Sequence, residues 1–192
     1  MSLIENPKKQ TPVALKGVLS HKTPGWVPIG ALFHVRVRVD RDTPCSLTEP
    51  SLAPLVLEAA RRYHDECRWW MSLLLVMPDH LHIIASFPAE PGMSRTISAW
   101  KTITAKRCGI KWQSNFFDHR LRNDDEFMEK AHYIRMNPVR AHLCKSPEDW
   151  PWVVCPSEAQ REAQVREAQV REAQVREAQV REAQVAAGVL GG

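Results

Sequence analysis

Residues 69–87 read WWMSLLLVMPDHLHIIASF, and this stretch decides the fold. Trp69–Val76 is an unbroken apolar run of strand length, which predicts a buried strand. The break that follows contains Pro78, and proline lacks the backbone donor that a central strand position needs. A second apolar run from His80 to Phe87 predicts the next strand. We expect these two strands to lie in one antiparallel sheet.

Further elements on both sides of this pair give the fold class. A strand is expected at 31–40, where valines alternate with polar residues, and another at 116–122. Helices are expected at 51–67, at 93–108, and from Asp124, where acids open the helix, to about Asn137, just before a proline. This order predicts an α+β protein, namely a ferredoxin-like split βαββαβ antiparallel sheet with an added C-terminal helix.

Two pairs of polar residues are expected to share faces of these elements. His80 and His82 lie two apart on a strand, so both imidazoles point away from the core while Leu81 points into it. Tyr133 and Asn137 lie four apart on a helix and are therefore neighbours. Two imidazoles and an amide oxygen can hold a divalent cation, beside which a hydroxyl can attack a phosphodiester. Backbone-bonded strand histidines and a helix-ending asparagine are the ordinary alternatives.

Five strings of residues, taken in order, resemble the REP-associated tyrosine transposases, which are single-tyrosine HUH transposases similar to the insertion-sequence 200/605 group. The strings are MPDHLHII at 77–84, WQ at 112–113, FDHRLRN at 117–123, YIRMNPVRA at 133–141 and PEDWPW at 147–152. The resemblance covers about residues 30–155, and several ordered motifs are more specific than any one of them. It implies that the added helix is catalytic, with Tyr133 as nucleophile and with His80, His82 and Asn137 as ligands of Mg²⁺ or Mn²⁺. It also implies cleavage and rejoining of hairpin-bearing single-stranded DNA through a 5′-phosphotyrosine.

Basic and aromatic side chains are the candidate contacts to such DNA, because phosphates attract cations and bases stack on rings. The basic candidates are Arg36, Arg38, Lys101, Lys106, Arg107, Arg122 and Arg140, of which Lys101 and Arg122 rank first. Asp118 and His119 match the family strings without an assigned role. Core packing is expected for at least two of Trp112, Phe116 and Phe117, and also for Tyr63, the other tyrosine of the chain.

Two other functions fit the same residues. One is a domesticated DNA-binding protein that keeps the fold without turnover, and the other is a metal-dependent phosphodiesterase that uses water. A monomer and a homodimer are both compatible with the sequence. Five cysteines without a Cys-x-x-Cys predict reduced thiols, and no signal or membrane segment is evident, so a cytoplasmic, nucleoid-associated protein is expected. The net charge of +4 suits an anionic partner as well as an ordinary soluble protein.

Composition divides the chain into three regions: a flexible arm at 1–28, the transposase-like domain at 29–156 and a low-complexity tail at 157–192. The tail contains five copies of Arg-Glu-Ala-Gln-Val at 161–185. On a helix, a five-residue period rotates successive valines by about 140°, so they form no apolar stripe. We therefore expect a solvated helix in the tail rather than a coiled coil.

Overall fold

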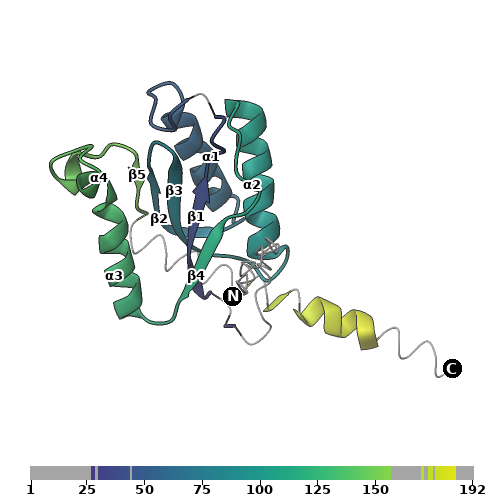
Figure 1. Ribbon diagram of the computed structural model, residues 1–192. Coiled ribbons are helices and arrows are strands. Elements are labelled where there is room, and N and C mark those ends of the chain that lie inside the picture. The colour runs from purple at the N-terminus through teal and green to yellow at the C-terminus, as the bar shows by residue number, and fades with distance from the viewer. Residues whose placement is uncertain are drawn as a thin grey trace, which may run out of the picture.

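The computed structural model describes residues 27–28, 30–43, 45–156, 170, 173–174 and 176–184. Within them, a five-stranded antiparallel sheet carries α1 and α2 on one face and α3 on the other (Figure 1). The strands are β1 (Leu32–Arg38), β2 (Trp70–Val76), β3 (His80–Ser86), β4 (Phe117–Leu121) and β5 (Val153–Val154). The helices are α1 (Ala53–Asp65), α2 (Gly92–Cys108), α3 (Asp124–Arg135) and α4 (Asn137–Arg140), followed by a 3-10 turn, η1, at Pro147–Asp149.

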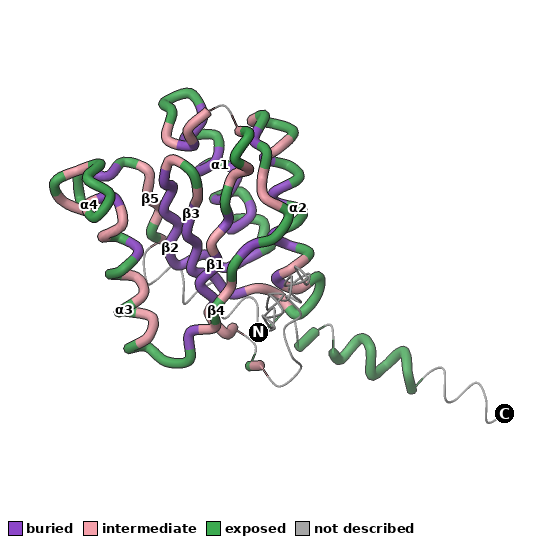
Figure 2. Tube along the Cα trace, in the orientation of Figure 1, coloured by how far each residue is buried: buried purple, intermediate pink, exposed green. Residues whose placement is uncertain are grey.

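The strand order β4-β1-β3-β2-β5 confirms the predicted fold class. Its first four members have the arrangement that a split βαββαβ unit gives, with β1 and β3 at the centre. β5 and α4 were not predicted, and both lie in the segment that follows the third helix. β2 and β3 are buried along nearly their whole length (Figure 2), as expected of strands covered on both faces.

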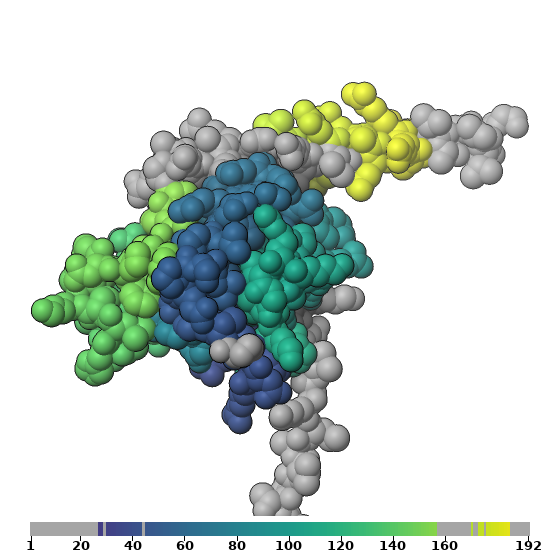
Figure 3. All heavy atoms as spheres, turned by 90° about the horizontal axis from the view of Figure 1, so that it is seen from above, coloured from purple at the N-terminus to yellow at the C-terminus, as the bar shows by residue number. Residues whose placement is uncertain are grey.

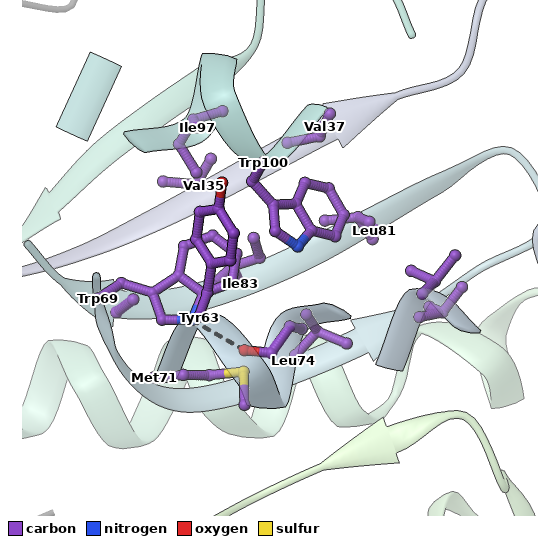
Figure 4. Close-up of a cluster of buried hydrophobic side chains, with 14 of the residues drawn as sticks. Val35, Val37, Tyr63, Trp69, Met71, Leu74, Leu81, Ile83, Ile97 and Trp100 are labelled. Atoms are coloured by element: carbon purple, nitrogen blue, oxygen red, sulfur yellow. Dashed lines mark hydrogen bonds between the residues drawn. The ribbon is translucent and has the colours of Figure 1, made fainter. Parts of the chain in front are cut away.

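The larger core lies between the sheet and the helices α1 and α2. Val35, Val37 and Leu81 point into it from β1 and β3, as the strand period predicts. The rings of Trp69 and Trp100, whose centroids are 5.8 Å apart, fill its centre (Figure 4). Burial of these residues fixes which side chains of β1 and β3 must point to the opposite face.

A second, smaller core holds α3 against that opposite face. Leu73, Leu75 and Ile84 from the sheet pack with Ile134 from α3 and with Trp150. Seen from above, α2 and the segment that contains α4 stand on opposite sides of the body (Figure 3). The third helix therefore lies across the sheet face that carries the histidines, as predicted.

The segment from η1 to β5 packs along β2 and forms hydrogen bonds with it. The Nε1 of the buried Trp150 indole donates to the carbonyl of Val76 at 3.0 Å, and Val153 and Val154 pair with β2. The amide of Val76 donates to the carbonyl of Trp152 at 2.9 Å. The string PEDWPW is thus a structural strap that covers the free edge of β2.

We expect Trp150→Phe to lower the free energy of unfolding by about 1–3 kcal/mol, because the buried carbonyl of Val76 loses its donor. Urea denaturation measures this loss. Trp152→Phe, at a partly buried ring of the same strap, serves as the control and should cost less. Equal losses in the two variants would contradict the role given to this hydrogen bond.

The two ends of the chain lie mostly outside the described residues. This applies to the predicted arm except Val27 and Pro28, and to the predicted tail except residue 170 and parts of 173–184. Residues 176–184 are helical and exposed, as the five-residue period predicts. The five cysteines are free thiols. In the part of the chain that the structure describes, no helix has the length and apolar character needed to cross a membrane.

Candidate functional site

Three histidines and an aspartate form a continuous chain of hydrogen-bonded side chains on the α3 face of the sheet. The Nε2 atoms of His80 and His82 are 3.2 Å apart. The other ring nitrogen of His80, Nδ1, lies 2.6 Å from Oδ1 of Asp79. The other ring nitrogen of His82, Nδ1, lies 2.9 Å from Nε2 of His34, a buried residue of β1. The predicted histidine pair therefore exists, with its Nε2 atoms converging and both Nδ1 atoms bonded to neighbours.

This separation fits two ligands of one divalent ion. Two nitrogens held about 2.1 Å from an ion at angles of about 90–110° lie about 3.0–3.4 Å apart. Histidines that bind metals also commonly donate their second ring N–H to an outer partner. Among the described residues, His, Cys, Asp and Glu side chains form no group of three that could hold a metal. A third protein ligand drawn from these residues would have to be of another type, such as an amide.

The surroundings of the histidines keep two of them neutral. Burial, together with the charges of Lys130, Arg36 and His119, lowers the pKa of His34 to about 4. Burial also lowers the pKa of His82 well below its ordinary value, assisted by His80, His34 and the same cations. The neutral imidazole is the form that binds metals.

Asp79 is held ionised beside His80. Burial raises the pKa of the Asp79 carboxyl, but the hydrogen bond with His80 and the positive charge of Arg38 bring it below its ordinary value. The carboxylate is therefore an acceptor for the Nδ1–H of His80, which orients that ring.

The chain path between β4 and α3 brings Tyr133 back toward the histidines. β4 begins beside Arg36, the cross-strand neighbour of His82, and carries the chain about 13 Å away along the sheet. The side chain of Asn123 then caps α3 by accepting from the amide of Glu126 at 2.8 Å. The nine-residue advance from Asp124 to Tyr133 returns the chain by about 14 Å. Tyr133 thus lies near the end of the sheet at which β4 began.

Asn137 lies beside Tyr133, but outside the helix in which it was predicted. α3 ends at Arg135, because Pro138 has no N–H to give to the carbonyl of Ile134. The Nδ2 of Asn137 supplies that donor instead at 3.2 Å, and it also donates to the carbonyl of Tyr133 at 3.0 Å. The amide nitrogen therefore finishes the helix, and the ligand atom that this side chain can offer is its Oδ1.

Two cations flank the ring of Tyr133, which is 42% exposed. The Cζ of Arg140 lies 4.8 Å from the ring centroid, and the Nζ of Lys130 lies 5.2 Å from it. Besides burial, the charge of Lys130 lowers the pKa of His34 and His82, so it is close to both. Lys130 therefore lies against the ring of Tyr133 and within electrostatic range of His34 and His82, and the predicted Arg140 lies at the same ring.

Comparison with known proteins bears on this arrangement. A REP-associated tyrosine transposase of Escherichia coli (strain K12) is 29% identical over 125 residues, which are 62% of this chain and 72% of the relative. The solved structure of a REP-associated tyrosine transposase bound to a REP hairpin matches with a TM-score of 0.57 at 23% identity, covering 70% of this chain and 82% of that one. The resemblance to the REP-associated tyrosine transposases is confirmed. No family model matches the chain.

Two of the predicted basic residues, both on β1, lie beside the histidine pair. Arg36 is the cross-strand neighbour of His82, and Arg38 is that of His80. The Cζ of Arg36 also lies 5.5 Å from the ring centroid of Phe117, which is 45% exposed. His119 pairs with His34 across β1 and β4, so it shares this face. Phe117 is therefore an exposed aromatic side chain beside the histidines.

Other predicted residues lie elsewhere. Lys106 and Arg107 belong to the last turn of α2, on the opposite face of the sheet, where Arg107 is 3.6 Å from a carboxylate oxygen of Glu58. Arg122 follows β4 at the far end of the sheet, 3.7 Å from a carboxylate oxygen of Glu126. Asp118 pairs with Val35, which faces the larger core. The structure does not bring these four to the histidine pair.

Lys101 has a structural position, which corrects its prediction as a leading DNA contact. Its side chain is buried, and its Nζ donates to the carbonyls of Gln113 at 2.5 Å and Ser114 at 2.9 Å. Burial lowers the pKa of this ammonium. Lys101 therefore holds the segment that leads into β4, because both carbonyls use its donors.

We expect Lys101→Met to lower the free energy of unfolding by about 1–3 kcal/mol, since two carbonyls lose a charged donor. Affinity for hairpin DNA should be unchanged in the folded variant. The comparison is Arg36→Gln, which should weaken binding and reduce the salt slope by about one. A thermal melt and a salt titration of binding would measure both, and a weaker salt slope in Lys101→Met would restore the original prediction.

Aromatic residues divide as predicted. Phe116 is buried in the larger core, and Trp112 packs against it with its indole N–H donated to Thr104 at 2.9 Å. Tyr63 is buried beside Trp69.

Sequence reasoning missed His34 and Lys130 as members of the site. The alternation of the first strand placed His34 on the correct face, but the strand register was needed to put it opposite Ile84 and next to His82. Lys130 lies three residues before Tyr133 on one helix face, a spacing that the sequence already contained.

Proposed function

We propose that this protein is a transposase that binds hairpin-bearing single-stranded DNA and cleaves and rejoins it through a 5′-phosphotyrosine at Tyr133. The observation that carries the proposal is the pair of converging Nε2 atoms of His80 and His82 on the face to which α3 returns Tyr133. The names of the relatives support a transposase, and the similar solved structure is bound to a REP hairpin. Arg36, Arg38 and Arg140 supply cations around this face for the DNA backbone.

In the proposed reaction, the hydroxyl oxygen of Tyr133 attacks the scissile phosphorus and loses its proton. The bond from phosphorus to the 3′ oxygen of the preceding nucleotide breaks, and that oxygen takes up a proton. The products are a free 3′-hydroxyl and a DNA 5′ end joined to tyrosine. Rejoining is the reverse attack by a 3′-hydroxyl, with Tyr133 as leaving group, so no nucleotide cofactor is needed.

We further propose that His80, His82 and Asn137 hold Mg²⁺ or Mn²⁺. The nitrogen separation of 3.2 Å and the bonded Nδ1 atoms support the histidines, and a mixed set of nitrogen and oxygen donors suits these metals. When bound, the ion polarises a phosphoryl oxygen and stabilises developing negative charge. Lys130 and Arg140 place positive charge beside the ring of Tyr133.

The test is a covalent-adduct assay with single-stranded DNA that contains a hairpin and a labelled 3′ flank. We expect an adduct that survives denaturing gel electrophoresis, that carries the label from the 3′ side of the nick, and that requires Mg²⁺ or Mn²⁺. Cleavage without an adduct at any time would favour the phosphodiesterase that uses water. Tight hairpin binding without cleavage in either metal would favour the domesticated DNA-binding protein.

A further inference from the structure

His34 is a buried titratable side chain that the proposed reaction does not use. It is 5% exposed, and its Nε2 lies 2.9 Å from Nδ1 of His82. Its own Nδ1 is buried without a hydrogen-bond partner among the described residues. A proton on this nitrogen would be costly, because a buried N–H without an acceptor loses more free energy than a buried lone pair without a donor.

With all three rings neutral, the carboxylate of Asp79 at one end and the unpartnered Nδ1 of His34 at the other agree with one direction of donation. The carboxylate of Asp79 accepts, so Nδ1 of His80 carries a proton and its Nε2 has the free lone pair. His82 must then donate from Nε2 to reach His80, which leaves its Nδ1 as an acceptor. His34 in turn donates from Nε2 to His82, and its buried Nδ1 is the unused acceptor. In this form the three rings donate in sequence toward Asp79.

This arrangement is incompatible with a metal ligand at Nε2 of His82, since that atom carries a proton. To offer its Nε2 lone pair, His82 must move the proton to Nδ1, and Nδ1–H then needs an acceptor. His34 becomes that acceptor when its own proton moves from Nε2 to Nδ1. The number of protons is unchanged, because each ring keeps one. In each ring the proton moves from one nitrogen to the other by exchange with solvent.

We propose that His34 is a positioning residue for His82, and that the two rings change tautomer together between the metal-free and the metal-bound protein. This inference rests on the proposed metal site. In the metal-free protein both rings are Nε2–H, and in the metal-bound protein both are Nδ1–H. His34 thereby sets how readily His82 becomes a ligand, without touching the ion or the DNA.

Long-range ¹H–¹⁵N NMR of the histidine rings in the full chain tests this directly, first without metal and then with the diamagnetic Mg²⁺. We expect His34 and His82 to change from Nε2–H to Nδ1–H in the same titration, while His80 stays Nδ1–H throughout. A metal-free protein in which His82 is already Nδ1–H would overturn the proposal. So would a change at His82 while His34 keeps its proton on Nε2.

Mn²⁺ affinity, measured by calorimetry, supplies the second readout. His34→Phe removes the acceptor and should weaken binding by about 10–100-fold, the usual effect of losing an outer partner. His34→Gln places an amide near the same position, can donate or accept, and should restore most of the affinity. His142→Asn, at an exposed residue, is the control and should bind as the wild type does. Equal affinities for His34→Phe and the wild type, with both folded by circular dichroism, would overturn the positioning role.

These outcomes separate this inference from the proposed function. If the wild type shows the joint tautomer change but forms no DNA adduct, the proposed chemistry fails and the role of His34 stands. If an adduct forms with normal metal dependence while His34→Phe binds Mn²⁺ normally, the proposed chemistry stands and the role of His34 fails. A wild type that binds neither metal overturns the metal-bound half of this proposal together with the metal site.

Discussion

We expect Tyr133→Phe to form no covalent adduct with hairpin-bearing single-stranded DNA under conditions in which the wild type forms one. The substitution removes one oxygen and keeps the ring, so the contacts of Lys130 and Arg140 with the ring face should survive. Because the ring is 42% exposed, stability should change little. Hairpin binding should persist, since it is assigned to other side chains. The loss should therefore appear in the chemistry alone.

The matched control for this variant is Tyr63→Phe, at the second tyrosine of the chain. Tyr63 is buried on α1, on the opposite face of the sheet. The Tyr63→Phe variant should therefore form the adduct at the wild-type level. Denaturing gels of both variants with the same labelled DNA make the comparison. If Tyr133→Phe forms the adduct, or if only Tyr63→Phe loses it, the assignment of Tyr133 as the nucleophile is wrong.

The histidine pair gives the second large effect. We expect His80→Ala and His82→Ala each to reduce cleavage by about 10³-fold or more, because loss of the metal removes several kcal/mol of charge stabilisation. Calorimetry should show Mn²⁺ binding lost in both. His82 is 3% exposed, so its removal also leaves a cavity. The side chain of His80 is 14% exposed, so His80→Ala should retain the wild-type melting temperature more closely.

Two further variants sharpen that prediction. Asn137→Ala should weaken metal binding less than either histidine change, since an amide is the weaker of the ligands, and should also loosen the end of α3. His142→Asn removes an exposed imidazole and should cleave normally. Normal cleavage and Mn²⁺ binding in both alanine variants of the pair would show that the metal site is elsewhere.

Strand period and turn chemistry were sufficient to predict the sheet, because Val35, Val37 and Leu81 alternate with polar residues whichever strand lies beside them. They placed His80 and His82 on the correct face for the same reason. The partner of His82 could not be predicted in this way, since His34 is far away in sequence and meets it through the antiparallel register. β5 was missed because two residues give no measurable period.

Charge alone was a poor guide to the DNA-binding residues. Lys101 and Arg36 carry the same formal charge, but one is bonded to two carbonyls in the interior and the other lies beside the histidine pair. Sequence could not separate them, because the difference depends on where α2 meets the loop before β4. The prediction for Asn137 was limited in a similar way. The four-residue spacing predicted that Asn137 lies beside Tyr133, but it did not predict that the helix ends at Arg135, before Pro138.

The bond from Asn137 to the carbonyl of Tyr133 makes the proposed third ligand and the proposed nucleophile one rigid unit. Any displacement of the end of α3 that withdraws the phenol from the histidines also withdraws the amide oxygen. The third ligand and the nucleophile would then reach the histidines together. A protein with a misplaced helix would then lack both the attacking group and the full set of ligands. Such a protein could not nick DNA that it is unable to reseal.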